Sequence, residues 1–70
     1  MKIEGRDITT TENYLDPVTY IPGHANGNAG HKDCEKGVII SMEEDFGTVK
    51  VLYCKGRTVQ ATNPSDLVWG

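Results

Sequence analysis

The 70-residue chain carries a formal net charge of −3, and 37% of its residues are hydrophobic. A chain of this length forms one small domain, and its apolar residues lie in runs too short for a membrane-spanning helix. The acidic balance argues against general binding to duplex DNA, because phosphate backbones are bound through clustered lysine and arginine side chains.

The segment 1–16 is polar and has no clear hydrophobic period. It is predicted to be an N-terminal extension that either frays or adds a short extra strand through Ile3 and Ile8. It has no long apolar region of the kind that marks a secretory signal. The expectation is therefore a cytoplasmic protein in which both cysteines stay reduced.

From residue 17 onward the pattern indicates short strands. Residues 18–21 predict the first strand, which Pro17 introduces. A long loop, residues 22–36, separates it from a second strand at residues 38–42, where the apolar side chains alternate at positions 38, 40 and 42.

The rest of the chain predicts three further strands. Residues 48–54 form the third and place three side chains on one face: Val49, Val51 and Tyr53. Residues 57–62 form the fourth and direct Val59 and Ala61 inward, and residues 63–69 predict a compact turn followed by a last short strand. Because helical periodicity is nearly absent, the chain is predicted to be all-β, with about five short strands that curl into a small barrel.

The order of these parts resembles the SH3-like small barrels, including their KOW and Tudor-type variants, over residues 18–69. The resemblance rests on three stretches: Gly37-Val38-Ile39-Ile40, Val49-Lys50-Val51-Leu52-Tyr53 and Asn63-Pro64-Ser65-Asp66-Leu67-Val68. It implies a five-stranded SH3-like barrel over residues 17–70, with a long first loop and a single 3₁₀ turn before the last strand.

The ligands of these families do not carry over to this chain. The first loop has none of the aromatic residues with which peptide-binding SH3 domains hold proline-rich segments, and only Phe46 lies in a loop where a Tudor-type cage needs several aromatics. A narrower string, residues 18–27 with the later His31, Asp33, Cys34, Glu35 and Gly37, resembles a group of small bacteriophage-encoded proteins. That resemblance implies a viral protein that acts inside a bacterial host cell.

Residues 22–36 contain both histidines and form the candidate functional loop, because long loops without secondary structure tend to be functional. One interpretation is a metal site built from ligand types that zinc prefers: His24, His31 and Cys34, with Cys54 or Asp33 as a fourth. Antiparallel pairing of the second and third strands would bring Cys54 within a few residues of Cys34. The spacings do not match a standard zinc finger, and a disulfide between the two cysteines is disfavoured in the cytoplasm.

A second interpretation is a loop that binds a ligand directly. Its glycines and asparagines allow left-handed backbone conformations, so that successive amides can form an anion-binding nest. The two histidines can supply further hydrogen-bond donors whose charge changes near neutral pH. The candidate ligand-binding residues are His24, Asn26, Asn28, His31, Asp33 and Glu35.

A third interpretation is a plain connection between strands, with Cys34 as a small buried apolar group. Catalysis is the least favoured, because a nucleophile–base pair of Cys34 with His24 or His31 would lack an orienting third residue. We therefore predict a non-enzymatic binding module, without a resident cofactor or membrane association, that contacts a host protein or a small anionic metabolite or nucleotide through residues 22–36. Enclosing a nucleotide would require a homo-oligomer. The alternative is a small zinc-stabilised domain with a structural or nucleic-acid-associated role.

Overall fold

Antiparallel β-strands make up most of the regular secondary structure of the computed structural model, which describes residues 1–70 and confirms the predicted all-β class. No helix in the chain has the length and apolar character needed to cross a membrane. The strands are β1 (Lys2–Ile3), β2 (Arg6–Asp7), β3 (Pro17–Tyr20), β4 (Glu35–Glu43), β5 (Thr48–Tyr53), β6 (Val59–Thr62) and β7 (Leu67–Trp69). The helical turns are α1 (Thr10–Asn13) and two 3₁₀ turns, η1 (Gly23–Ala25) and η2 (Pro64–Asp66).

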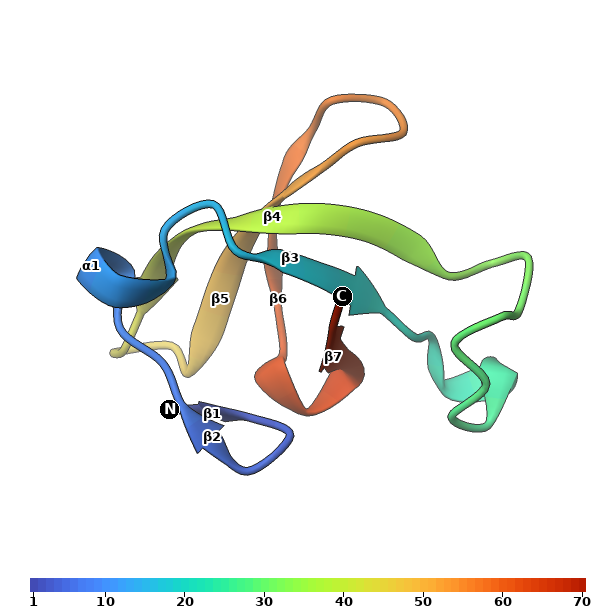
Figure 1. Cartoon of the computed structure of the whole chain (residues 1–70), viewed down its shortest axis with the longest axis horizontal. Coiled ribbons are helices and arrows are strands. Elements are labelled where there is room, and N and C mark those ends of the chain that lie inside the picture. The colour runs from blue at the N-terminus through green and yellow to red at the C-terminus, as the bar shows by residue number, and fades with distance from the viewer.

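Five strands form one sheet in the order β6-β5-β4-β3-β7, and β1 pairs with β2 in a separate hairpin. The chain runs as a meander from β3 to β6, and β7 then returns to pair with the other side of β3 (Figure 1). No ladder joins the two edge strands, β6 and β7. The predicted 3₁₀ turn before the last strand is present as η2, where the Asn63 side chain accepts a hydrogen bond from the Ser65 amide.

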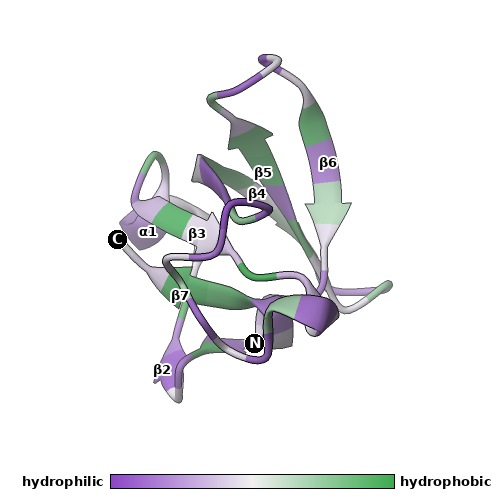
Figure 2. Cartoon of the chain, turned by 90° about the vertical axis from the view of Figure 1, so that its right-hand side faces the viewer, coloured by the Kyte–Doolittle hydropathy of each residue, from purple (hydrophilic) through white to green (hydrophobic).

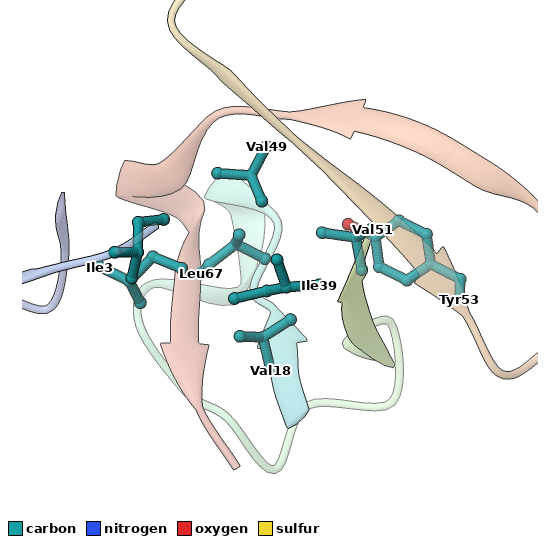
Figure 3. Close-up of a cluster of buried hydrophobic side chains, with 8 residues drawn as sticks. Ile3, Val18, Ile39, Val49, Val51, Tyr53 and Leu67 are labelled. Atoms are coloured by element: carbon teal, nitrogen blue, oxygen red, sulfur yellow. The ribbon is translucent and has the colours of Figure 1, made fainter. Parts of the chain in front are cut away.

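The hydrophobic core lies on the concave side of this sheet, where side chains from distant parts of the chain meet (Figure 3). β5 alternates as predicted, and its inward side chains join a cluster of eight: Ile3, Ile8, Val18, Ile39, Val49, Val51, Tyr53 and Leu67. Figure 2 shows hydrophobic residues along much of β5 and β7, whereas β2 and many of the connections are hydrophilic.

The inward face of β4 differs from the one predicted at positions 38, 40 and 42. Ile39 is fully buried, because it pairs with Val51 and directly opposite residues share one face of a sheet. A register shift between Ile39 and Ser41 then turns the strand, so that Met42 pairs with Val49 and packs against the core. A bulge of this kind inserts one extra residue, which breaks a strict alternation.

The prediction for β6 is wrong by one residue. Val59 pairs with Leu52, and Ala61 pairs with Lys50, both on the outer face of β5, so Val59 is 51% exposed. Thr62 pairs with Val49 and is buried instead. A shift of one position exchanges the two faces of a strand, because side chains alternate with a period of two.

The segment 1–16 is packed as part of the domain. Glu4 and Gly5 both have positive φ angles, which suits the two-residue turn between β1 and β2. Ile3 is fully buried in the core, and its carbonyl accepts a hydrogen bond from the Trp69 indole N–H at 3.0 Å. The Arg6 guanidinium lies 3.9 Å from the centre of the Trp69 ring, so the hairpin and β7 hold each other in place.

Candidate functional site

The loop between β3 and β4, residues 22–34 together with the first residues of β4, is a folded segment that projects from one end of the sheet (Figure 1). It begins with the turn η1, and Ala25 within this turn is 4% exposed, which anchors the loop on the domain. Asn26 and Gly27 follow with φ angles of 51° and 78°, the left-handed conformation that asparagine and glycine tolerate. The predicted backbone freedom of these residues is therefore used to reverse the chain.

Asp33 lies between the two histidines of this loop. One carboxylate oxygen, Oδ2, is 2.7 Å from His24 Nε2 and 3.9 Å from His31 Nδ1. The two imidazole rings stand edge to face, with centroids 5.3 Å apart. The backbone amide of Asp33 donates to His31 Nδ1 at 3.0 Å, so neutral His31 carries its proton on Nε2. We call these three residues the His24–His31–Asp33 group.

The electrostatics of this group favour an ionised carboxylate. The hydrogen bond from His24 holds the pKa of Asp33 below its ordinary value of 3.8, against partial desolvation that raises it. The charges of His24, His31 and Lys55 act in the same direction as the hydrogen bond. Asp33 therefore presents a full negative charge at neutral pH, next to two imidazole nitrogens.

The backbone amides of the loop are largely consumed by hydrogen bonds within the loop. Gly30 donates to the Asn28 side-chain oxygen, and His31 donates to the Asn28 carbonyl. The other amides that donate inside the loop belong to Ala25, Asn26, Asn28, Asp33 and Cys34. An anion-binding nest needs successive free amides that point at one spot. Because most amides of this loop already donate hydrogen bonds within it, few are free to bind an anion.

A cleft of about 360 Å³ opens beside Asp33, where the ends of several elements meet. Tyr20 at the end of β3 and Tyr53 at the end of β5 lie edge to face, with ring centroids 6.4 Å apart. The Tyr53 hydroxyl shares a 2.6 Å hydrogen bond with Thr62 Oγ1, and desolvation raises the Tyr53 pKa above 10.0 against the effect of this bond. The cleft is lined by Tyr20, Asp33, Glu35, Tyr53, Gln60, Ala61, Thr62, Asn63 and Asp66.

The charge of this cleft has one sign. Asp33, Glu35 and Asp66 contribute carboxylates, and none of the lining residues is lysine, arginine or histidine. Clustered like charges in a concave site raise the local concentration of the opposite charge. We call this site the acidic tyrosine cleft, and its chemistry suits a cationic group.

The predicted site residues divide into three sets. His24, His31 and Asp33 come together, and Glu35 lines the acidic tyrosine cleft. Asn26 and Asn28 serve the turns of the loop. The two predicted cysteine ligands lie outside the group: Cys34 donates its thiol to the Asn28 carbonyl at 3.3 Å, and Cys54 is an exposed free thiol after β5.

Of the nine residues that line the cleft, the sequence prediction included only Asp33 and Glu35, and the residues it missed include both tyrosines and Asp66. The tyrosines occupy the last positions of β3 and β5, and strand ends are where a loop or turn can complete a cleft. That position is the signal that marks them, because alternation alone identifies both only as residues of the core or its rim.

A second hollow of about 500 Å³ lies at the opposite end of β4, between the β4–β5 turn and the start of α1. It contains no predicted site residue, and Phe46 at its edge is 79% exposed. Its acidic residues, Glu43 at the end of β4 and Glu44 and Asp45 in the turn that follows, are consecutive in the chain, and no pair of aromatic rings lines this hollow. The acidic tyrosine cleft is therefore the better-formed candidate.

No family model, curated protein or solved structure matches the chain. What the residues around Asp33 bind is therefore derived from their own charges, distances and neighbours.

Proposed function

We propose that the chain is a non-enzymatic binding module with an SH3-like order of strands, and that its acidic tyrosine cleft receives a lysine or arginine side chain of a partner protein. Three features support the SH3-like assignment: the β3–β6 meander, the return of β7 to β3, and the 3₁₀ turn η2 directly before β7. In the viral setting that the sequence resemblance implies, the partner is a host-cell protein.

The observation that carries this proposal is the combination of three carboxylates with two tyrosine rings in one cleft. A guanidinium or ammonium group gains from charge-assisted hydrogen bonds to carboxylates and from contact with aromatic faces. At about 360 Å³ the cleft is near the lower end of the range for ligand pockets, a size that suits one side chain and its flanking backbone.

The sequence also predicted a small anionic metabolite or nucleotide as a ligand of residues 22–36. Such a ligand would meet the carboxylates of Asp33 and Glu35 and a loop whose amides are mostly paired internally. Repulsion between these carboxylates and a negatively charged ligand disfavours binding, so the cationic ligand has the better support.

Binding without catalysis is supported by the surroundings of the only nucleophile in the loop. The Cys34 thiol donates to a backbone carbonyl of Asn28 instead of a histidine nitrogen. Activation of a cysteine requires a neighbouring base or cation that stabilises its thiolate.

The proposal is tested by titrating the isotope-labelled protein with two short peptides that differ only in one central residue, arginine or glutamate. We expect the arginine peptide to shift the amide signals of Tyr20, Glu35 and Tyr53, and we expect this binding to weaken as salt is added. The glutamate peptide and a nucleotide should leave these signals in place.

Matched variants locate the contact. Glu35→Gln and Asp66→Asn should each weaken binding of the arginine peptide by about 1.4-fold to fivefold, the range for exposed ion pairs. Glu44→Gln removes the same charge from the β4–β5 turn, outside the cleft, and should leave affinity unchanged. Equal weakening by Glu44→Gln would show that only net charge matters and would contradict a specific site, as would preferential binding of the nucleotide.

A further inference from the structure

We propose that His24, His31 and Asp33 form a binding site for a divalent transition-metal ion of the zinc class, with two nitrogen ligands, one oxygen ligand and open coordination positions. The site differs from the zinc site expected from sequence, because neither cysteine belongs to it and Asp33, one of the two expected choices for a fourth ligand, is the third. It shares Asp33 with the neighbouring cleft, but its argument does not need the cationic side chain proposed for that cleft.

The spacing of the three side chains fits one shared ion. One ligand atom from each residue lies within 4.8 Å of the others, and the two measured distances to Asp33 Oδ2 are 2.7 Å and 3.9 Å. With metal–ligand bonds of about 2.1 Å, two ligands of a tetrahedral zinc ion are about 3.4 Å apart. The measured distances lie on either side of this value, so small side-chain rotations bring the atoms into position.

The donor types select the class of ion. Imidazole nitrogen suits zinc, copper, nickel and iron, whereas calcium and magnesium prefer sites made of oxygen. Two of the three donors here are imidazoles, and the third is a carboxylate. This donor set therefore favours a transition metal of the zinc class over calcium or magnesium.

The exposure of the group indicates an open site. The side chains of His24, Asp33 and His31 are 62%, 47% and 29% exposed, so the ion would keep positions that face solvent or a partner. Three protein ligands with an open position characterise exchangeable or reactive zinc sites, whereas structural sites enclose the ion with four.

The loop is already ordered by its own hydrogen bonds before any ion arrives. The amides of Ala25, Asn28 and His31 each donate to a carbonyl three residues earlier, and Ala25 is buried against the domain. The fold therefore already supplies most of the free energy that orders the three side chains, and the ion is not needed to close the loop. Removal of the metal should leave the domain folded, which distinguishes this site from a zinc finger.

Two hydrogen bonds must give way when the ion binds. The ion replaces the contact between His24 Nε2 and Asp33 Oδ2, and ligation through His31 Nδ1 replaces the bond from the Asp33 amide. The amide signal of Asp33 in a nuclear magnetic resonance spectrum therefore reports occupancy of the site directly.

The experiment is a titration of the full chain, kept reduced, with zinc chloride, followed by calorimetry and by the amide spectrum. We expect one ion per chain and a large shift of the Asp33 amide. A parallel cobalt titration should give the visible bands of a nitrogen–oxygen site without a thiolate charge-transfer band, because neither cysteine coordinates. A thiolate band would assign the metal to the cysteines and overturn the proposal.

Variants separate the ligands from their neighbours. His24→Ala and His31→Ala should each weaken the affinity for zinc by more than about tenfold. Loss of a residue that only hydrogen-bonds to a ligand already costs about 10- to 100-fold in metal affinity. The double variant Cys34→Ser with Cys54→Ser should bind zinc like the parent. His24 is largely exposed, so His24→Gln should keep the parent amide spectrum elsewhere and show that lost binding is not lost folding.

Two results would overturn the site: no zinc binding by the parent chain, or unchanged binding in both histidine variants. These titrations contain no peptide, so their failure leaves the proposed cleft ligand untouched, and failure of the peptide titration leaves the metal site untouched. Asp33 lines the cleft as well, so a bound ion would place positive charge at that end of it.

Discussion

Replacing Ile3 with alanine tests whether the N-terminal hairpin is an integral part of the domain. Ile3 lies in a strand of only two residues, yet it is 0% exposed and belongs to the core cluster (Figure 3). The substitution removes the buried side chain but keeps the Ile3 carbonyl, which accepts the indole N–H of Trp69. The change in unfolding free energy therefore reports packing and not the loss of this hydrogen bond.

The expected cost is large for so small a domain. Truncation of a buried isoleucine to alanine costs about 2–5 kcal/mol, from lost transfer energy and the cavity left behind. A chain of 70 residues has a stability of about 4–10 kcal/mol, at about 0.05–0.15 kcal/mol per residue. Ile3→Ala should therefore remove between a fifth and all of the stability.

Urea unfolding measures the effect, followed both by Trp69 fluorescence and by far-ultraviolet circular dichroism. Lys2→Ala is the matched control, because Lys2 is the exposed neighbour on the same strand and its loss should change stability by less than about 0.5 kcal/mol. If Ile3→Ala matches Lys2→Ala within this margin, the hairpin contributes nothing to the core and the reasoning fails. A fluorescence transition that precedes the loss of strand signal would refute it as well, since it would mean that Trp69 detaches separately.

Three further predictions test the interior of the sheet and the electrostatics of the site. Gly37→Ala places a Cβ 2.6 Å from Val51 Cγ1 and 2.7 Å from the Leu52 backbone oxygen. Because the backbone cannot rotate away as a side chain can, β4 and β5 must shift, and denaturant unfolding should show a loss of about 1–3 kcal/mol in the free energy of unfolding. An unchanged midpoint would contradict this close approach. Because the pKa of Tyr53 is raised in the fold, its contribution to stability is fully present below pH 10.0 and is lost as the pH rises through the pKa of the folded state. Tyr53→Phe should therefore flatten the decline in stability at alkaline pH. An identical decline in both proteins would assign that decline to another group. Because the pKa of Asp33 is lowered in the fold, its contribution to stability is present above pH 3.8 and is lost as the pH falls through the pKa of the folded state. His24→Ala should return the pKa of the Asp33 carboxyl, followed by nuclear magnetic resonance, toward 3.8.

The elements that could be predicted from sequence are those specified by local patterns. Val49, Val51 and Tyr53 alternate without interruption, and they form the inward face of β5 as predicted. The turn at Asn63 and Pro64 was also predictable, because an asparagine cap followed by proline specifies a turn through side-chain and ring geometry. Each of these signals acts within a few residues and needs no information from the rest of the fold.

The faces of β4 and β6 depend on pairing with β5 and could not be read locally. Val59 has the character of an inward residue, but its partner in the ladder is Leu52, and the edge position of β6 leaves it half exposed. In β4, Val38, Ile39 and Ile40 are all apolar, so hydrophobicity alone does not say which of them the register will bury. The register between strands, and the bulge after Ile39, make that choice.

The composition of residues 22–34 indicated a site for an anionic ligand, whereas the folded loop gives more support to the cationic ligand that we propose. Glycine and asparagine were read as sources of free amides, yet in the folded loop Asn26 and Asn28 serve turns that use the amides up. Once the backbone is satisfied, only side chains remain to recognise a ligand, and at this end of the sheet the acidic ones dominate. Asp33 is the residue on which both proposals meet, because the same turns that consume the amides hold its carboxylate between two imidazoles and at the rim of the cleft. Because the backbone amides of this loop donate hydrogen bonds within the loop, the groups left to contact a ligand are mainly carboxylate acceptors, which favour a cation.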